Sequence, residues 1–381
     1  MNRLVIGTLC VVLLAGCGKD DPAVKRFTLS SDQGLYPPTC LTRTPSGDLV
    51  ALVGEGEQRT FTLFRSETEG RSWSRWCALP TPNDPAEVDL IAGGNLLIAY
   101  ANLGRSIWIA TLQADPEAPG DSLVYKTELP SEAPIRSLSM AAPSMADETL
   151  PELLLSYQTG DPADSLREMF LRHSNDGGIT WSEATSIAEG VLGDVCLERP
   201  AEGETYTNMI FSRDRFLRWQ GIASVRRTSE FEIRVRVPPE SPNRVAHLGN
   251  LMAAVGVSSR NQVVAAGSTN KGRNWEVAIA LARDSDHPRH PDLDGGFGRF
   301  WVTYLSGDSL LMARTANDPR YPKRWSRFIW VEKTECLGWP SIVALPDSLG
   351  GVLYAVPGGK VRFARLEESV PVMYRPRTTT P

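Results

Sequence analysis

Short apolar runs separated by turn residues are the dominant pattern along this chain. Between positions 36 and 79, apolar stretches at 36–41, 49–53, 60–65 and 73–79 are divided by segments rich in Gly, Pro, Ser and Asp. Runs of this length, bounded by turn residues, predict β-strands rather than helices. Four such strands in succession predict one antiparallel β unit, and similar units follow along the chain.

A turn motif marks the ends of several of these units. Residues 174–181 fit the pattern Ser-x-Asp-x-Gly-x-Thr-Trp at every specified position, through Ser174, Asp176, Gly178, Thr180 and Trp181. Weaker copies lie at 66–73 and 268–275, and an expanded version runs from 314 to 326. In such a turn the Ser and Asp side chains accept hydrogen bonds from nearby backbone amides, and Gly supplies a positive φ. We therefore interpret Asp176 as structural rather than catalytic.

The spacing of the motif predicts a ring of repeated units. Its closing residues are Trp73, Trp181, Trp275 and Trp325, and they follow one another at one or two multiples of about 50 residues. A repeat of that length with four strands is typical of a β-propeller blade. The prediction is an all-β propeller of four-stranded antiparallel blades, seven in number, with six as the alternative.

The predicted propeller spans residues 23–370. Its last blade lacks an outer strand, and residues 23–29 alternate in a way that predicts a strand able to fill the gap and close the ring. Residues 371–381 are rich in Pro and Thr, which predicts a disordered tail.

The turn motif and the openings of the blades resemble those of the sialidase superfamily, including the proteins with BNR (Asp-box) repeats. This resemblance implies a propeller with a site where the blades meet. It also implies three Arg that grip a substrate carboxylate, a Tyr nucleophile with a Glu partner, and an Asp as acid/base.

The chain departs from this pattern at several positions. Leu35 stands in place of the first Arg, and Trp339 stands in place of the nucleophilic Tyr. The loop that would carry the acid Asp has Glu55 instead. Glu198 followed by Arg213 resembles the Glu-Pro run and the second Arg of the family. Sialidase activity is therefore not expected, and Glu198, Arg213 and Glu55 are the candidates for any remaining catalysis.

A ligand site is expected at the axial mouth, where the opening residues of the blades converge. An aromatic ring there could stack on the apolar face of a sugar, while charged side chains bind its hydroxyl groups. The alternative interpretation is purely structural: these residues fill the channel or cap strands. The candidate ligand-binding residues are Tyr36, Arg199, His290, Asp292 and Trp339, with His247 nearby.

Composition excludes several other functions. The chain has a net charge of −5 and no basic stripe, which argues against nucleic-acid binding. The polar run 287–294 contains two His but matches no metal-ligand spacing, so we interpret it as a loop and predict no metal. No nucleotide-binding or nucleophile-elbow motif is present, and no cofactor is expected.

The N-terminus resembles a bacterial lipoprotein signal. Arg3 precedes an apolar run, and Leu14, Ala15 and Gly16 come directly before Cys17. The resemblance implies removal of residues 1–16, lipidation of Cys17 and a tether over 17–22. Residues 18–21 resemble the export tag of Bacteroidetes surface lipoproteins. We expect an outer-membrane lipoprotein at the cell surface, with a periplasm-facing location as the alternative.

Four cysteines remain in the mature chain, at 40, 77, 196 and 336. In an oxidising compartment they could form up to two disulfides in three connectivities, and Cys40–Cys77 is the pairing we predict.

The leading hypothesis is a monomeric propeller lipoprotein that binds a glycan or an envelope protein. One alternative is a glycoside hydrolase acting on glycans, and another is a scaffold of an envelope complex.

Overall fold

The computed structural model describes most of the chain between Val24 and Glu367. The described ranges are 24–30, 39–44, 46–55, 60–79, 87–93, 95–113, 123–143, 151–161, 167–200, 206–223, 226–228, 230–238, 242–282, 288–307 and 310–367. The signal peptide, Cys17, Tyr36 and the C-terminal tail lie outside these residues. Among the described residues, no helix is long and apolar enough to cross a membrane.

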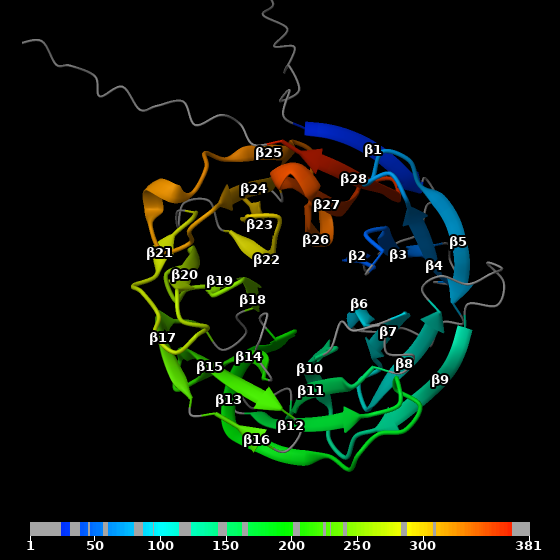
Figure 1. Cartoon of the computed structure of the whole chain (residues 1–381), viewed down its shortest axis with the longest axis vertical. Helices are drawn as coiled ribbons and strands as arrows, with labels where there is room; N and C mark the ends of the chain where they lie inside the picture. Colours follow the sequence, from blue (N-terminus) through cyan, green and yellow to red (C-terminus); the bar gives the residue numbers. More distant parts are fainter. Residues whose placement is uncertain are drawn as a thin grey trace, which may run out of the picture.

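The strands form six antiparallel sheets arranged as a ring about a central axis (Figure 1). Five of the sheets are four-stranded blades, which confirms the predicted blade type. From the axis outward they are β2 (Thr39–Arg43), β3 (Leu49–Glu55), β4 (Thr60–Ser66) and β5 (Ser74–Leu79); β6 (Glu87–Gly93), β7 (Leu96–Asn102), β8 (Ser106–Gln113) and β9 (Leu123–Pro130); β18 (Asn243–Leu248), β19 (Leu251–Val257), β20 (Val263–Ser268) and β21 (Ile279–Ala280); β22 (Arg289–Gly296), β23 (Arg299–Ser306), β24 (Leu310–Ala316) and β25 (Ile329–Glu332); and β26 (Leu337–Leu345), β27 (Leu349–Val356), β28 (Lys360–Leu366) and β1 (Val24–Ser30).

The sixth sheet has eight strands, and it corrects the predicted number of blades. It contains β10 (Ile135–Ala141), β11 (Leu153–Thr159), β12 (Arg167–Ser174), β13 (Thr185–Glu198), β14 (Thr207–Arg213), β15 (Phe216–Ala223), β16 (Arg226–Arg227) and β17 (Phe231–Arg236). The first part of β13 pairs with β12 and its last part pairs with β14. The predicted third and fourth blades are therefore one sheet, and the expectation of seven or six separate blades is wrong for the described residues. A register shift between Leu192 and Cys196 lets β13 bend without a turn.

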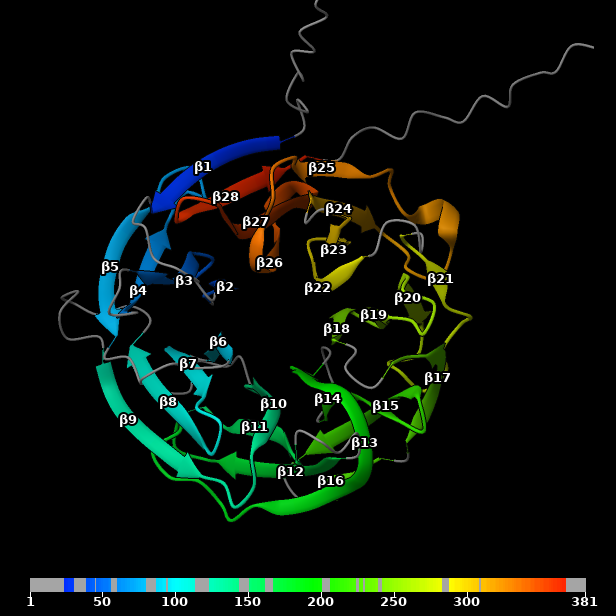
Figure 2. The same ribbon diagram turned by 180° about the vertical axis from the view of Figure 1, so that it is seen from behind.

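The N-terminal strand closes the ring, as predicted. β1 pairs antiparallel with β28, with Val24 opposite Leu366, so the first and last strands of the propeller share one sheet (Figure 2). Apolar clusters fill the space between each sheet and the next, including the space between the β26–β28 sheet and the β2–β5 blade. A further cluster lies within the eight-stranded sheet, between residues of β10–β12 and residues of β13–β15.

The turn at 174–181 has the predicted hydrogen bonds. Ser174 Oγ accepts from Gly178 N at 2.9 Å, and Asp176 Oδ1 accepts from Thr180 N at 2.9 Å. Gly178 has a φ of 92°, and Trp181 packs against the cluster formed by β7, β8, β10 and β11. The Asp176 carboxylate accepts hydrogen bonds from within its own turn, which favours the structural interpretation of this residue.

Side chains join the inner strands where no sheet pairing is available. Asp292 and Asp294 of β22 accept hydrogen bonds from the backbone of Ile342 and Ala344 in β26, at 2.8 and 2.6 Å. Ser137 and Ser139 of β10 accept likewise from β13, and Ser341 of β26 accepts from β2. The constant offsets show that successive inner strands run parallel. An inner strand is the exposed edge of its sheet, so these side chains satisfy amides that would otherwise be unpaired.

Substitution of Asp294 tests this role. Its carboxylate accepts from Ala344 N and from Gly295 N, at 2.6 and 2.8 Å. Asp294→Ala is expected to lower the free energy of unfolding by about 1–3 kcal/mol, because two amides lose their acceptor. Thermal unfolding of the variant beside Glu183→Ala, which removes an exposed carboxylate, checks the prediction. Equal stability of the two variants would contradict it.

Candidate functional site

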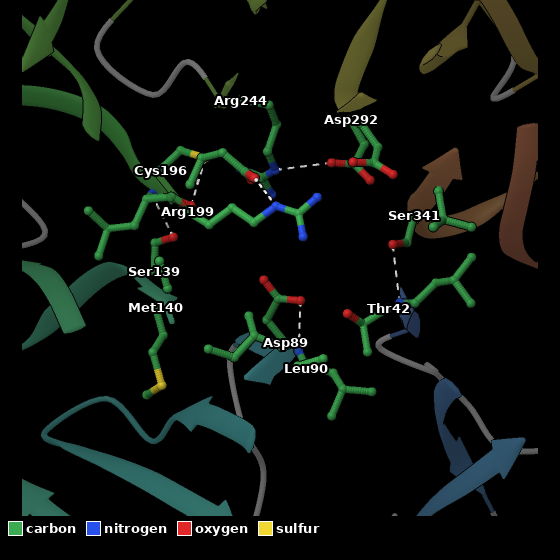
Figure 3. A pocket seen from close by; sticks show the side chains of 18 of the residues that line it. Thr42, Asp89, Leu90, Ser139, Met140, Cys196, Arg199, Arg244, Asp292 and Ser341 are labelled. Atoms are coloured by element: carbon green, nitrogen blue, oxygen red, sulfur yellow. Dashed lines mark hydrogen bonds and ion pairs between the residues drawn. The ribbon is translucent and has the colours of Figure 1, made fainter. Parts of the chain in front are cut away.

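The inner strands enclose a cavity of about 450 Å³ on the propeller axis (Figure 3). Strands from every sheet contribute to its wall, because each sheet presents its innermost strand to the axis. The lining is unusually rich in ionisable side chains. These are Arg43, Glu87, Asp89, Glu198, Arg199, Arg244, Asp292 and Asp294.

Arg244 lies among several carboxylates on one side of the cavity. Its Nε lies 3.3 Å from Asp292 Oδ1, and its Nη1 donates to the backbone oxygen of Asn243 at 2.9 Å. Burial alone would lower the pKa of Arg244, but the charges of Asp292, Asp194 and Asp89 raise it above its ordinary value. For Asp292, burial outweighs Arg244 and raises the pKa to about 6. Arg244 is therefore a fixed cation engaged by the protein itself.

Two carboxyl groups of β6 lie on the opposite side of the cavity. Asp89 accepts from its neighbour Leu90 N at 2.8 Å and from Tyr100 Oη at 3.0 Å. Burial is the main cause that raises the pKa of Glu87 to about 8, and Asp194 adds to it. At neutral pH Glu87 is therefore largely protonated and can donate a hydrogen bond.

Glu198 and Arg199 come at the end of β13 and form a second group. Arg199 Nε lies 3.7 Å from Glu198 Oε1, and its guanidinium points into the open centre of the cavity (Figure 3). His247 Nε2 lies 3.9 Å from the same Glu198 oxygen, and neither imidazole nitrogen of His247 has a hydrogen-bond partner. Burial raises the pKa of Glu198 to about 8 and lowers the pKa of His247 to about 4. Both groups are therefore mainly neutral near pH 7.

The sequence candidates divide into three sets. Glu198, Arg199 and Asp292 line the cavity, as expected of residues that converge on the axis. Arg213 does not, because it lies at the far end of β14 and its Nη1 pairs with Glu230 Oε1 at 2.6 Å. Arg213 therefore does not share the cavity with Glu198, which the sequence-based hypothesis had expected. Tyr36 and the side chain of Glu55 lie outside the described residues.

His290 and Trp339 lie near the beginnings of β22 and β26, whereas Glu198 lies at the end of β13. Since the inner strands run parallel, these residues sit toward the other end of the channel and do not line the cavity. Their rings stack, with centroids 5.0 Å apart and planes 25° apart, and Trp339 is 42% exposed. The expectation of one mouth shared by all candidates is therefore wrong. The aromatic pair forms a separate surface.

Several lining residues were missed from the sequence. Arg43, Glu87, Asp89 and Arg244 follow no motif, and only their place on inner strands brings them together. Phe297, in the β22–β23 turn, also lines the cavity, and the Arg43 guanidinium lies 4.3 Å from the centre of its ring. A search for charged residues in the first strand of every predicted blade would have found most of this set.

A Tyr–Glu pair does occur in the protein, but it lies away from the cavity. Tyr354 Oη donates to Glu332 Oε2 at 3.2 Å in the seam between the last two sheets. Burial and the charge of Glu332 raise the pKa of Tyr354, so less of its nucleophilic phenolate forms near neutral pH. This pair is therefore structural, and the sialidase-type nucleophile has no counterpart among the described cavity residues.

The predicted Cys40–Cys77 disulfide is wrong. Cys40 lies on the inner strand β2 and Cys77 on the outer strand β5 of the same blade, with β3 and β4 between them. Three strand spacings, about 14 Å, exceed the reach of a disulfide. Cys196, which lines the cavity, is buried and unpaired, and burial raises its pKa to about 12. Within the described ranges, no three His, Cys, Asp or Glu side chains gather closely enough to hold a metal ion.

The raised pKa values of Glu87 and Glu198 predict a loss of stability as the pH rises from acid to neutral values. The folded state keeps these protons up to about pH 8, whereas an unfolded Glu loses its proton near pH ~4.3. Stability is therefore highest below the unfolded pKa, falls as the pH rises toward the folded pKa, and levels off above it. Both side chains are partly exposed to solvent, which reduces the effect, and we expect it to be about 2 kcal/mol. Glu87→Gln should remove part of this slope in urea titrations at several pH values. An unchanged slope would contradict the assignment.

Comparisons with known proteins support the fold. No protein family matches the chain, and no curated protein is significantly similar in sequence. The Dos1 propeller superposes with a TM-score of 0.54 at 9% identity, covering 89% of this chain and 93% of that one. A fucose-specific lectin from Aleuria aurantia has a TM-score of 0.50 at 11% identity, over 78% and 96% of the two chains. The Hadza microbial sialidase Hz136 has a TM-score of 0.47 at 12% identity, over 88% and 66%.

The likenesses to the Dos1 propeller and to the lectin, together with the observed sheets, define the class: the chain is a β-propeller. At such low sequence identities the similarity shows the fold alone, and it does not assign the neighbours' ligands or reactions to this chain.

Proposed function

We propose that the protein is a carbohydrate-binding propeller whose ligand enters the axial cavity. The observation that carries the proposal is this cavity of about 450 Å³, walled by charged side chains from inner strands all round the ring. Its volume lies within the range of small-molecule sites. The fucose-specific lectin among the structural neighbours binds a sugar, which agrees with this ligand class.

The lining favours a neutral sugar over an acidic one. Arg244 faces Asp292, and Arg199 lies beside Glu198. Burial lowers the pKa of Arg43, and the nearby carboxylate of Asp294 partly offsets this by stabilising the charged guanidinium. An acidic ligand would have to compete with Asp292 for Arg244 and with Asp294 for Arg43, whereas the mainly protonated Glu198 leaves Arg199 open to a ligand. Sugar hydroxyl groups can donate to carboxylates and accept from guanidinium groups at once.

Binding should depend on Arg199, whose guanidinium points into the cavity. The lipidated full-length protein, solubilised in detergent, is screened on a glycan array and the best neutral sugar is titrated by calorimetry. Arg199→Ala is expected to weaken binding at least about tenfold, because a hydrogen bond to a charged group contributes about 1.5–3 kcal/mol. Arg213→Ala, which removes an Arg outside the cavity, is the matched control. Binding that survives Arg199→Ala unchanged, or the absence of any bound glycan, would refute the proposal.

A glycoside hydrolase is the second candidate, and one observation favours it. Burial separates the pKa values of two carboxyl groups in the same cavity, about 8 for Glu198 and about 6 for Asp292. Between these values Glu198 is an acid and Asp292 a base, the pairing that glycoside hydrolysis uses. Release of sugar from a fluorogenic glycoside panel, lost in Glu198→Gln, would establish this activity. No turnover on the panel would leave the binding function alone.

The proposed location is the outer membrane, with the propeller held at the cell surface by lipid on Cys17. The support is the lipoprotein-like sequence that ends at Cys17 and the short chain between it and β1. A glycan receptor at the surface would meet its ligand before import, which suits a binding module without catalysis.

A further inference from the structure

The outer edge of the β22–β25 blade carries exposed aromatic side chains. Trp330 of the outer strand β25 and Phe328, directly before that strand, alternate with the buried residues Ile329 and Val331, so both point outward. They are 47% and 37% exposed, and Tyr321 in the preceding turn is 49% exposed. We call residues 320–333 the blade rim. The guanidinium groups of Arg314 and Arg320 lie 5.1 and 4.8 Å from the ring centres of Phe328 and Tyr321, and both rings nevertheless remain exposed.

The same rim is positively charged in an acidic protein. Lys323, Arg324, Arg327 and Lys333 are exposed, while the whole chain has a net charge of −5. The structure describes every residue from 320 to 333, and the single acid among them is Glu332, which is buried and accepts from Arg362. The rim therefore combines aromatic rings with cations, while the carboxylates next to it in sequence are Asp318, which pairs with Arg320, and the exposed Glu335.

The rim lies beside the point where the chain enters the propeller. Arg26 of β1 donates from Nε to the backbone oxygen of Val331 at 2.9 Å, so β1 and β25 adjoin (Figure 1). The propeller begins with Val24, and Cys17 stands only seven positions earlier. Seven residues span at most about 24 Å. On the proposed lipidation of Cys17, the bilayer is held within that distance of the chain's entry into β1.

We propose that the blade rim docks on an anionic lipid surface and fixes the orientation of the propeller on its membrane. The aromatic rings fit the interface between headgroups and acyl chains, and the cations fit lipid phosphates. The location part of the proposed function supplies the membrane, and the rim supplies a second attachment. A single lipid tether would leave the propeller free to swivel, whereas docking would hold the axial channel in a set direction.

Tryptophan quenching by brominated acyl chains tests the proposal on the lipidated full-length protein. The protein is reconstituted into phosphatidylcholine vesicles with and without phosphatidylglycerol. We expect quenching in the anionic vesicles that disappears in Trp330→Phe, because Trp330 is the residue that approaches the acyl chains. The pair Lys323→Glu and Arg324→Glu keeps Trp330 but should weaken docking at least about tenfold. Lys126→Glu, an exposed cation on β9 in another blade, is the control and should change nothing.

Three results would overturn the proposal. They are no quenching in the wild-type protein, equal quenching in vesicles without anionic lipid, and quenching that survives the reversal at 323 and 324. A rim substitution that changes the molecular mass in detergent would instead assign the rim to contacts between copies of the chain. Flotation of the Cys17→Ser variant with vesicles separates anchoring through the lipid on Cys17 from docking of the blade rim. Flotation of the wild type without quenching leaves the anchor and removes docking.

Discussion

Replacing Glu332 by alanine is expected to lower the free energy of unfolding by about 3–5 kcal/mol. Glu332 is 5% exposed and lies in the seam where the ring closes. Its Oε2 accepts from Arg362 at 2.6 Å and from Tyr354 at 3.2 Å, and Arg26 of β1 lies 3.8 Å away. Removing the carboxylate leaves these partners in a low-dielectric seam without their counter-charge.

The pH dependence of this group has the opposite sign to that of the cavity. Burial alone would raise the pKa of Glu332, but hydrogen bonds from the Lys333 amide and from Arg362 lower it below its ordinary value. Its contribution is therefore present at neutral pH and is lost as the pH falls through the folded pKa.

Thermal and urea unfolding of matched variants measure the effect. Glu332→Gln keeps the shape of the side chain but not its charge, so its cost should lie between those of wild type and Glu332→Ala. Glu335→Ala removes an exposed carboxylate nearby and should change stability by less than about 0.5 kcal/mol. Similar stabilities for Glu332→Ala and Glu335→Ala would show that the seam does not depend on this carboxylate.

Gly70→Ala is expected to destabilise the ring by about 3 kcal/mol or more, through a clash added to backbone strain. Gly70 has a φ of 83°, and a Cβ at this position would overlap the ring of Phe363 in β28. Phe363 is fully buried and also contacts Trp73 of the same turn, with ring centroids 5.1 Å apart. The clash therefore falls on the contact between the first blade and the sheet that closes the ring.

Other glycines with positive φ separate the cost of the clash from the cost of backbone strain. Gly47 has a φ of 99° and open space around it, so Gly47→Ala measures strain alone and should cost about 1 kcal/mol. In Gly272→Ala the new Cβ would lie 2.5 Å from Trp219 Cε2, and in Gly178→Ala it would lie 3.2 Å from Thr111 Oγ1. The order of melting temperatures should follow these contacts. A Gly70→Ala variant as stable as Gly47→Ala would exclude the clash.

The fold was largely accessible from the sequence because it depends on local signals. The turn at 174–181 forms its hydrogen bonds within eight residues, so its residue types suffice to predict it. The closing strand β1 was predicted from a missing partner in the last blade, and Val24 indeed pairs with Leu366. The number of separate sheets was not accessible, because a register shift rather than a turn bends β13.

The site was less accessible because it depends on contacts between sheets. Glu198 and Asp292 reach the cavity, but no local signal distinguishes them from Arg213, which faces Glu230 instead. Arg244 and Glu87 lie in strands that read as ordinary β sequence. Their chemistry arises only when parallel inner strands from distant parts of the chain surround one axis.

The shared strand β13 has a mechanical consequence. At other junctions that the structure describes, such as 131–134 between β9 and β10, successive sheets are joined by a segment outside the strands, whereas β13 carries its hydrogen bonds from one half of its sheet into the other. A pull that separates these halves must break a continuous ladder, while other junctions can part by straightening a linker. The two halves of the eight-stranded sheet are therefore expected to resist separation more than other neighbouring sheets. Glu198 and Arg199 lie at the end of the strand that joins these halves.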